Sequence, residues 1–130
     1  MSCTNNNKNK ERNDSVTGPL PEISVQQLYA KHQNGVSFYL LDVRSEGEFE
    51  SGHLSFTDAL IPYDQLDSRL GEIPQDKAAL IYCLCRSGRR SKIATEYLRS
   101  VGLSNVFNVK GGIVAWSAAG YPIDNGKLRP

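Results

Sequence analysis

Four short apolar runs recur along this chain, at residues 38–43, 59–61, 78–84 and 106–109. The first of them is apolar almost throughout, which is typical of a strand covered on both faces in a parallel sheet. Segments with helical signals lie between the runs. This alternation of strands and helices predicts an α/β domain with a mainly parallel sheet and right-handed crossover connections.

Capping signals and spacing predict the first helices. Ser24 followed by Gln27 three residues later forms a capping-box pattern, so we expect a helix there that ends before Gly35. Two shorter helical segments are expected at residues 46–50 and 66–70. Both lie between predicted strands, as the alternation requires.

A longer amphipathic helix is predicted after the run at 78–84. It ends at Gly102, because glycine is favoured just after a helix, and its expected buried stripe is Ile93, Ala94, Tyr97, Leu98 and Val101. The pair Gly111–Gly112 then turns the chain into a last helix that contains Ala115, Trp116 and Ala119.

Residues 1–18 are nearly all polar and cannot bury a core. We therefore expect a disordered tail there, one domain at residues 19–125 and a short C-terminal tail at 126–130. No run approaches the roughly 20 apolar residues of a membrane-spanning helix, and no signal peptide is present in the sequence. The cytoplasm is the default compartment, and the alternative is a truncated lipoprotein anchored outside the cytoplasm through a lipid on Cys3.

Charge and cysteine content narrow the function classes. Fifteen basic residues balance fourteen acidic ones, so bulk charge gives no reason to expect a nucleic acid or a membrane surface as partner. Three cysteines are too few for a disulfide scaffold. Cys83 and Cys85 are too far apart along an extended strand for a disulfide to be expected between them. Nothing in the sequence demands more than a monomer.

The main candidate for chemistry is a cysteine at the end of a predicted buried strand. Cys85 follows the run at 78–84 and precedes a glycine-containing loop and a helix. The N–H groups of such a loop and the helix N-terminus stabilise negative charge on the sulfur. Arg86, Arg89 and Arg90 add positive potential. The pattern therefore predicts a reactive thiolate with a lowered pKa, at the sheet edge where sites in α/β folds gather.

Three segments together resemble the signatures of rhodanese-like domains, namely residues 42–54, 85–91 and 108–116. The resemblance implies a single domain with a five-stranded parallel sheet and helices on both faces. It implies a thiosulfate sulfurtransferase, in which the cysteine takes a sulfane sulfur from a small anionic donor and holds it as a persulfide. A thiophilic acceptor, such as cyanide, a thiol or another protein, then removes that sulfur. No metal or organic cofactor is needed.

The residues of the cysteine loop can be given roles on this basis. The N–H groups that hold the thiolate and the persulfide are expected from Arg86, Ser87, Gly88, Arg89, Arg90 and Ser91, with the Ser91 hydroxyl as a further donor. Gly88 supplies the unusual backbone conformation of the turn. Arg86 and Arg89 are expected to point outward and attract the anion. Arg90 either binds the anion or is held by Asp42 or a helix-end carbonyl.

Supporting residues are expected on a strand that lies beside the cysteine strand. Asp42 and Arg44 are interpreted as a buried pair or hydrogen-bond network that supports the loop rather than as catalytic groups. Cys83 lies within its strand and is interpreted as a core residue, and the alternative is a second thiol that accepts the sulfur or protects the site. His53 is expected to make a structural hydrogen bond.

Two other functions remain open. Phosphatases of the related fold wrap a phosphate with Cys-x5-Arg, and Cys85 with Arg90 gives Cys-x4-Arg, one residue short. A sulfur carrier or a docking and regulatory module is the non-enzymatic alternative.

Two segments depart from the family pattern. The loop at 52–58 lacks the usual Pro-Gly and is expected to differ near the rim of the site. The strand before Cys85 is about two residues too long, so it contains a bulge or begins later.

Overall fold

A computed structural model of the chain describes residues 20–128 and contains one five-stranded sheet in the order β1-β5-β4-β2-β3. Every strand pairs in parallel with its neighbours. The strands are β1 (Glu22–Ile23), β2 (Tyr39–Asp42), β3 (Ala59–Leu60), β4 (Ile81–Leu84) and β5 (Val106–Val109). The predicted α/β class and parallel sheet are therefore confirmed.

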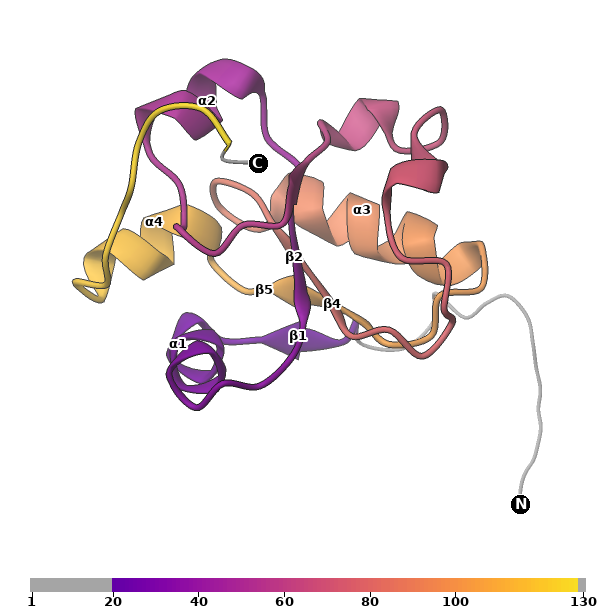
Figure 1. Cartoon of the computed structure of the whole chain (residues 1–130), viewed down its shortest axis with the longest axis horizontal. Helices are drawn as coiled ribbons and strands as arrows, with labels where there is room; N and C mark the ends of the chain where they lie inside the picture. The colour runs from indigo at the N-terminus through magenta and orange to yellow at the C-terminus, as the bar shows by residue number, and fades with distance from the viewer. Residues whose placement is uncertain (1–19, 129–130) are drawn as a thin grey trace.

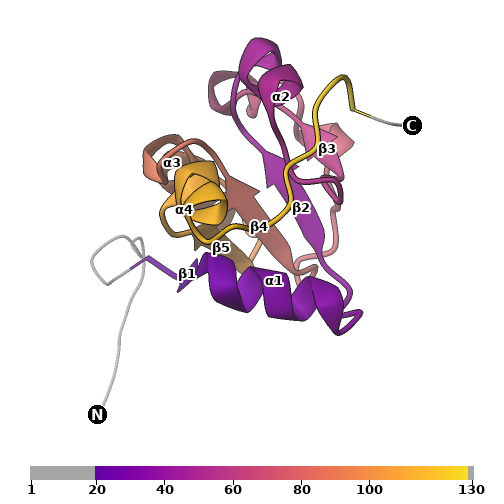
Figure 2. The same ribbon diagram turned by 90° about the vertical axis from the view of Figure 1, so that its left-hand side faces the viewer.

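Helices cover both faces of the sheet (Figures 1 and 2). The α-helices are α1 (Val25–Gln33), α2 (Glu46–Ser51), α3 (Arg89–Ser100) and α4 (Gly112–Ala118), and the 3-10 helices are η2 (Tyr63–Gln65) and η3 (Leu70–Glu72). In Figure 1, α1 and α4 lie to the left of the strands, whereas α3 lies to the right. Each face has its own apolar core, and neighbouring residues of β2 serve opposite cores: Leu41 packs on the α3 side and Leu40 on the α1 side. This is why the β2 sequence is apolar at successive positions.

The first two α-helices begin at capping boxes. The Ser24 hydroxyl accepts a hydrogen bond from the Gln27 N–H, and the Gln27 side chain accepts from the Ser24 N–H, as the sequence predicts. Ser45 and Glu48 form the same arrangement at the start of α2. These contacts satisfy N–H groups that a helix leaves without internal partners.

Two strands, β1 and β4, differ most from the prediction. Strand β1 was not predicted, because it is only two residues long and lies at the sheet edge, where β5 is its single neighbour. Strand β4 begins at Ile81 rather than at residue 78. The Ala78 N–H donates to the Asp76 carboxylate and the Ala79 N–H to the Asp76 carbonyl, so a turn occupies the residues before the strand. The later start of β4 therefore accounts for the extra length of the predicted strand.

The buried face of α3 also differs from the predicted stripe. Ile93 and Val101 are 46% and 47% exposed. The residues that α3 buries are Ser91, Ala94, Thr95 and Leu98. Polar residues can occupy this face because their hydroxyl groups have partners: the Thr95 hydroxyl donates to the Ser91 carbonyl at 2.7 Å. The short helix expected at 66–70 is a turn flanked by η2 and η3.

The chain after α4 returns to the sheet edge that carries α2 (Figure 2). Asp124 and His53 form an isolated antiparallel bridge, and the Gly126 N–H donates to the Glu50 carbonyl. The expected N-terminal tail and Cys3 lie outside the described residues. Within the described part of the chain, no helix has the length and apolarity needed to cross a membrane.

Candidate active site

Cys85 lies directly after β4, between the ends of the two neighbouring strands. Strand β4 pairs with β2 on one side and β5 on the other. Residues 86–88 form a short loop, and α3 begins at Arg89. The cysteine is therefore at the carboxyl edge of a parallel sheet, beside a helix N-terminus, where binding sites of this fold class occur.

Hydrogen-bond donors of the loop converge on the Cys85 sulfur. The Gly88 N–H donates to Sγ at 3.1 Å, and the Ser91 hydroxyl lies 3.3 Å from it. Burial by itself raises the pKa of the Cys85 thiol, but hydrogen bonds from the Ser91 hydroxyl and from the N–H groups of Ser91, Gly88 and Ser87 outweigh it. The pKa of Cys85 is consequently lowered below that of an ordinary cysteine. A lowered pKa increases the fraction of the thiol that is present as the reactive thiolate at a given pH.

The loop keeps this shape because α4 binds its outer side. The Ile113 N–H donates to the Cys85 carbonyl at 2.9 Å, and the Val114 N–H donates to the Arg86 carbonyl at 3.0 Å. A side chain on Gly112 would place its Cβ 2.4 Å from the first carbonyl oxygen and 2.5 Å from the second. Only glycine permits this approach, and with the carbonyl groups bound to α4, N–H groups of the loop face the sulfur. Gly88, at φ 105°, makes the turn itself.

The three arginines of the loop have different surroundings. Arg86 and Arg89 are exposed. Arg90 forms a two-pronged ion pair with Glu48 of α2, in which both N···O distances are 2.8 Å. Hydrogen bonding to Arg90 lowers the pKa of Glu48 to about 2. The anchor of Arg90 is thus Glu48, and not Asp42 or a helix-end carbonyl as the sequence suggested.

Asp42 and Arg44 form a buried pair at the end of β2. The Arg44 guanidinium donates to both Asp42 carboxylate oxygens, at 2.8 Å in the shortest contact. It also donates to the Gly52 carbonyl at 2.7 Å and to the Glu48 carbonyl at 3.4 Å. Arg44 therefore connects the end of β2 to the last turn of α2. Because α2 carries the Glu48 side chain, this pair supports the loop indirectly.

An open groove of about 570 Å³ adjoins the loop. Its lining residues come from the segment after β2, from α2, from the cysteine loop and from α4, and they are Arg44, Gly47, Glu48, Ser51, Arg86, Ile113, Val114 and Ser117. The segment 53–58 contributes none of them. Phe56 packs instead on His32 of α1 and on Trp116 of α4. The departure of this segment from the family pattern thus affects the α1 side of the sheet rather than the rim of the groove.

Cys83 and His53 occupy structural positions. Cys83 is a free thiol in the core below Cys85, and burial raises its pKa to about 12. His53 Nδ1 lies 2.8 Å from the Phe49 carbonyl, and the two rings stack. Among residues 20–128, no three His, Cys, Asp or Glu side chains gather where they could hold a metal ion.

Two residues at the site were not found by sequence reasoning. Glu48 holds Arg90, and Asn108 of β5 accepts a hydrogen bond from the Ser91 hydroxyl. The spacing of Ser45 and Glu48 could have marked the start of α2, but neither interaction has a local signal. The paired residues are separated by 42 positions in the first case and by 17 in the second.

Replacing Arg44 with leucine should strongly destabilise the domain. The substitution leaves the Asp42 carboxylate buried without its partner, which costs about 3 to 5 kcal/mol of unfolding free energy. Urea unfolding followed by circular dichroism measures the loss. The control is Arg69→Leu, which breaks the exposed Arg69–Glu72 pair and should change stability little. Equal losses in the two variants would contradict the structural role of Arg44.

The pH dependence of alkylation should distinguish the Cys85 thiol from the Cys83 thiol. In a Cys3→Ser background, iodoacetamide should modify Cys85 with a pH midpoint below that of the urea-unfolded chain, because the folded-state pKa is lowered. Cys83 should remain unmodified until the chain unfolds, because its pKa is raised to about 12. Peptide mapping by mass spectrometry reports both rates. The lowered pKa would be refuted by a Cys85 midpoint at or above that of the unfolded chain.

Comparison with known proteins places these features in a family. The family model of the rhodanese-like domain matches residues 24–119. The chain is 38% identical over 103 residues to a sulfurtransferase of Allochromatium vinosum, an alignment that covers 78% of this chain and 92% of that protein. It is 31% identical over 110 residues to the putative sulfur carrier protein YrkF of Bacillus subtilis, covering 85% of this chain and 58% of that one.

Solved structures agree with the sequence comparisons. A rhodanese-related protein of Thermoplasma volcanium superposes with a TM-score of 0.72 at 29% identity, covering 82% of this chain and 99% of the other. The rhodanese-like domain of an Anabaena protein gives a TM-score of 0.73 at 29% identity, covering 82% and 80%. With its cysteine loop at the end of β4 and the family match over nearly all of the described domain, the chain belongs to the rhodanese-like domain family.

Proposed function

We propose that this protein is a sulfurtransferase that moves a sulfane sulfur from thiosulfate, or a similar small anion, to a thiophilic acceptor. The observation that carries the proposal is the convergence of the Gly88 N–H and the Ser91 hydroxyl on the Cys85 sulfur. Sulfurtransfer in general is also supported by the 38% identity to the A. vinosum sulfurtransferase.

The reaction proceeds in two displacements. The Cys85 thiolate attacks the outer sulfur of thiosulfate, a new S–S bond forms, and sulfite leaves with the electron pair of the broken S–S bond. Cyanide or an acceptor thiolate then attacks the outer sulfur of the Cys85 persulfide. That S–S bond breaks, and Cys85 leaves as a thiolate. A thiol with a lowered pKa suits both steps, because it is ionised for attack and is a good leaving group.

The depth of the sulfur fits a persulfide intermediate. Without the added sulfur, Cys85 is 1% exposed. An S–S bond of about 2 Å places the outer sulfur of the persulfide closer to the surface. The N–H groups that stabilise the thiolate can then stabilise the anionic persulfide.

Exposed positive charge favours an anionic donor. Arg86 lines the groove, and Arg89 is exposed at the first turn of α3. Neither forms an ion pair with a residue in the described part of the chain. Arg90, in contrast, is neutralised by Glu48. We therefore assign attraction of the donor to Arg86 and Arg89, and a structural role to Arg90.

A non-enzymatic sulfur carrier or a docking and regulatory module is the second candidate. The 31% identity to YrkF, which is named a putative sulfur carrier, favours the carrier alternative. A carrier and an enzyme share the persulfide and differ in turnover. The phosphatase alternative has less support, because the loop is one residue short and its arginine is held by Glu48.

Thiocyanate formation from thiosulfate and cyanide tests the proposal. The wild-type protein should form thiocyanate over many turnovers, and after thiosulfate alone its mass should increase by one sulfur atom. Cys85→Ser should lose both signals, whereas Cys83→Ser should keep them if it folds. A single loading without turnover would favour the carrier, and no loading by any sulfane donor would refute sulfur transfer.

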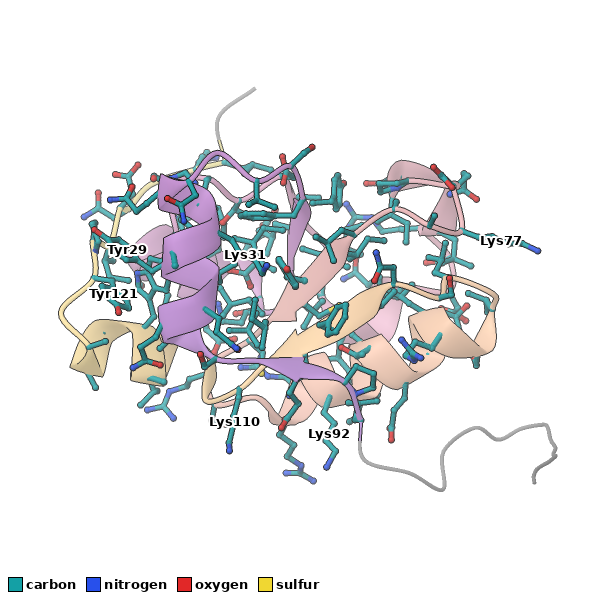
Figure 3. The ribbon with its side chains drawn as sticks, turned by 90° about the horizontal axis from the view of Figure 1, so that it is seen from below. Tyr29, Lys31, Lys77, Lys92, Lys110 and Tyr121 are labelled. Atoms are coloured by element: carbon teal, nitrogen blue, oxygen red, sulfur yellow. The ribbon has the colours of Figure 1, made fainter. Side chains whose placement is uncertain are left out.

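Removing Arg86 should weaken binding of the donor. Arg86→Ala should raise the KM for thiosulfate about two- to fivefold at low salt, and the difference should shrink as salt screens the charge. Lys77→Ala is the control, because the exposed Lys77, which lies at one edge of the molecule (Figure 3), precedes β4, whereas Arg86 follows the other end of that strand. If both variants raised KM equally, the effect would be one of net charge rather than of the groove.

A further inference from the structure

The Ser91 hydroxyl belongs to a chain of hydrogen bonds that runs from the sulfur to the sheet edge. Its oxygen lies 3.3 Å from Cys85 Sγ and is hydrogen-bonded to Asn108 Oδ1 on the other side. Asn108 Nδ2 donates in turn to the Glu22 carboxylate at 3.0 Å. The register of the strands explains why these side chains lie in a row, because Asn108 pairs with Glu22 of β1 and with Cys83 of β4. Ser91 and Asn108 are both buried, so water does not substitute for these partners.

Glu22 determines which way the Asn108 amide points. A carboxylate only accepts hydrogen bonds, so the amide must turn its NH2 group toward Glu22. The Asn108 carbonyl oxygen then faces Ser91. The reversed amide would bring two acceptors together at Glu22 and is disfavoured. Glu22 therefore holds Asn108 as an acceptor toward the Ser91 hydroxyl.

Ser91 has one hydroxyl hydrogen and two neighbours that can accept it. When Cys85 is a thiol, its S–H can donate to the Ser91 oxygen while Ser91 donates to Asn108, and every group is satisfied. When Cys85 is a thiolate, the sulfur and the Asn108 oxygen compete for the single Ser91 hydrogen, and a hydrogen that turns to the sulfur leaves the buried Asn108 oxygen without its donor. A buried acceptor without a donor is unfavourable. The hydrogen stays on its oxygen throughout, and only its direction changes.

We infer that Asn108 is a positioning residue that, oriented by Glu22, draws the Ser91 hydrogen away from the Cys85 sulfur and so restrains thiolate formation. The inference rests on the proposed function only in taking Cys85 as the nucleophile. The loop N–H groups favour the thiolate, and the Asn108 oxygen opposes them through one hydroxyl group. This balance sets the nucleophilicity of the sulfur and its ability to leave.

Other charged or titratable groups near the sulfur stay the same in the test. Cys83 lies below it on β4 and remains a thiol, because its pKa is about 12. Arg90 on α3 interacts with Cys85 through its charge and remains paired with Glu48. Arg86 and Arg89 are exposed on the loop side. A difference between variants at Asn108 can therefore be assigned to the chain of hydrogen bonds.

A double-mutant cycle tests the inference. All proteins carry Cys3→Ser, and the pH dependence of Cys85 alkylation is measured in the wild type, Asn108→Leu, Ser91→Ala and the double variant. In Asn108→Leu the pKa of Cys85 should fall, so that the thiolate fraction well below the pKa rises about tenfold. The limiting rate at high pH should decrease, because a less basic thiolate is a weaker nucleophile.

The shift must depend on Ser91. In the Ser91→Ala background, Asn108→Leu should leave the pH profile unchanged, because Asn108 acts only through the hydroxyl group. An equal shift in both backgrounds, or no fall when Ser91 is present, overturns the inference. A merely structural role of Asn108 would change the thermal midpoint without a Ser91-dependent change in the profile.

Glu22→Gln is the second variant, at an exposed position. A glutamine amide can donate to the Asn108 oxygen, so the reversed amide becomes acceptable and the Ser91 hydrogen turns to the sulfur. Loss of the Glu22 charge lowers the pKa of Cys85 in both backgrounds. The expected result is therefore a larger fall with Ser91 present than with alanine there, and equal falls overturn the inference.

The titration separates this inference from the proposed function. It requires no sulfur donor, so a Ser91-dependent shift in a protein that transfers no sulfur would support the inference and refute the transferase. Sulfur transfer with no Ser91-dependent shift would support the transferase and refute the inference.

Discussion

The two hydrogen bonds between the first turn of α4 and the carbonyl groups of Cys85 and Arg86 are the constraint on which the site depends. The carbonyl of one residue and the N–H of the next residue belong to the same peptide unit. Because that unit is planar and trans, the two groups point in nearly opposite directions. Binding the Arg86 carbonyl on the outer side therefore turns the Ser87 N–H, one of the donors that lower the pKa of Cys85, toward the sulfur. Gly112 permits the approach, since any side chain there would overlap both carbonyl oxygens. A short helix late in the chain thus shapes a loop that precedes it by more than twenty residues.

The charged residues at the site are of two kinds: some are paired with one another, and others are exposed to solvent. Glu48 neutralises Arg90, and the buried pair of Asp42 and Arg44 holds the end of β2 against α2. Arg86 and Arg89 remain open to solvent. An arginine that is already bound to a carboxylate has less capacity to bind a small anion than one in water. The division explains how a nearly neutral protein presents positive charge at one point of its surface.

The success of sequence reasoning differed between elements for physical reasons. Strands β2 and β4 were predicted because both faces of a central strand are buried, so that the apolar pattern is nearly continuous. Strand β1 was missed because a two-residue edge strand carries almost no pattern. The stripe of α3 was misplaced at Ile93 and Val101, because a helix can bury polar side chains that have partners, and the partners of Ser91 and Thr95 depend on the folded chain.

The sequence by itself determined the α/β architecture, the position of Cys85 at the end of a strand, and the glycines that its loop requires. These follow from local signals: apolar runs, capping pairs and residues that tolerate unusual backbone angles. Only the tertiary structure decided that Arg90 meets Glu48, that α4 binds the loop carbonyls, and that the Ser91 hydroxyl lies between the Cys85 sulfur and the Asn108 side chain. Each of these interactions joins residues far apart in the chain, and its distance and direction are set by how β-strands and helices pack rather than by the residues around either partner.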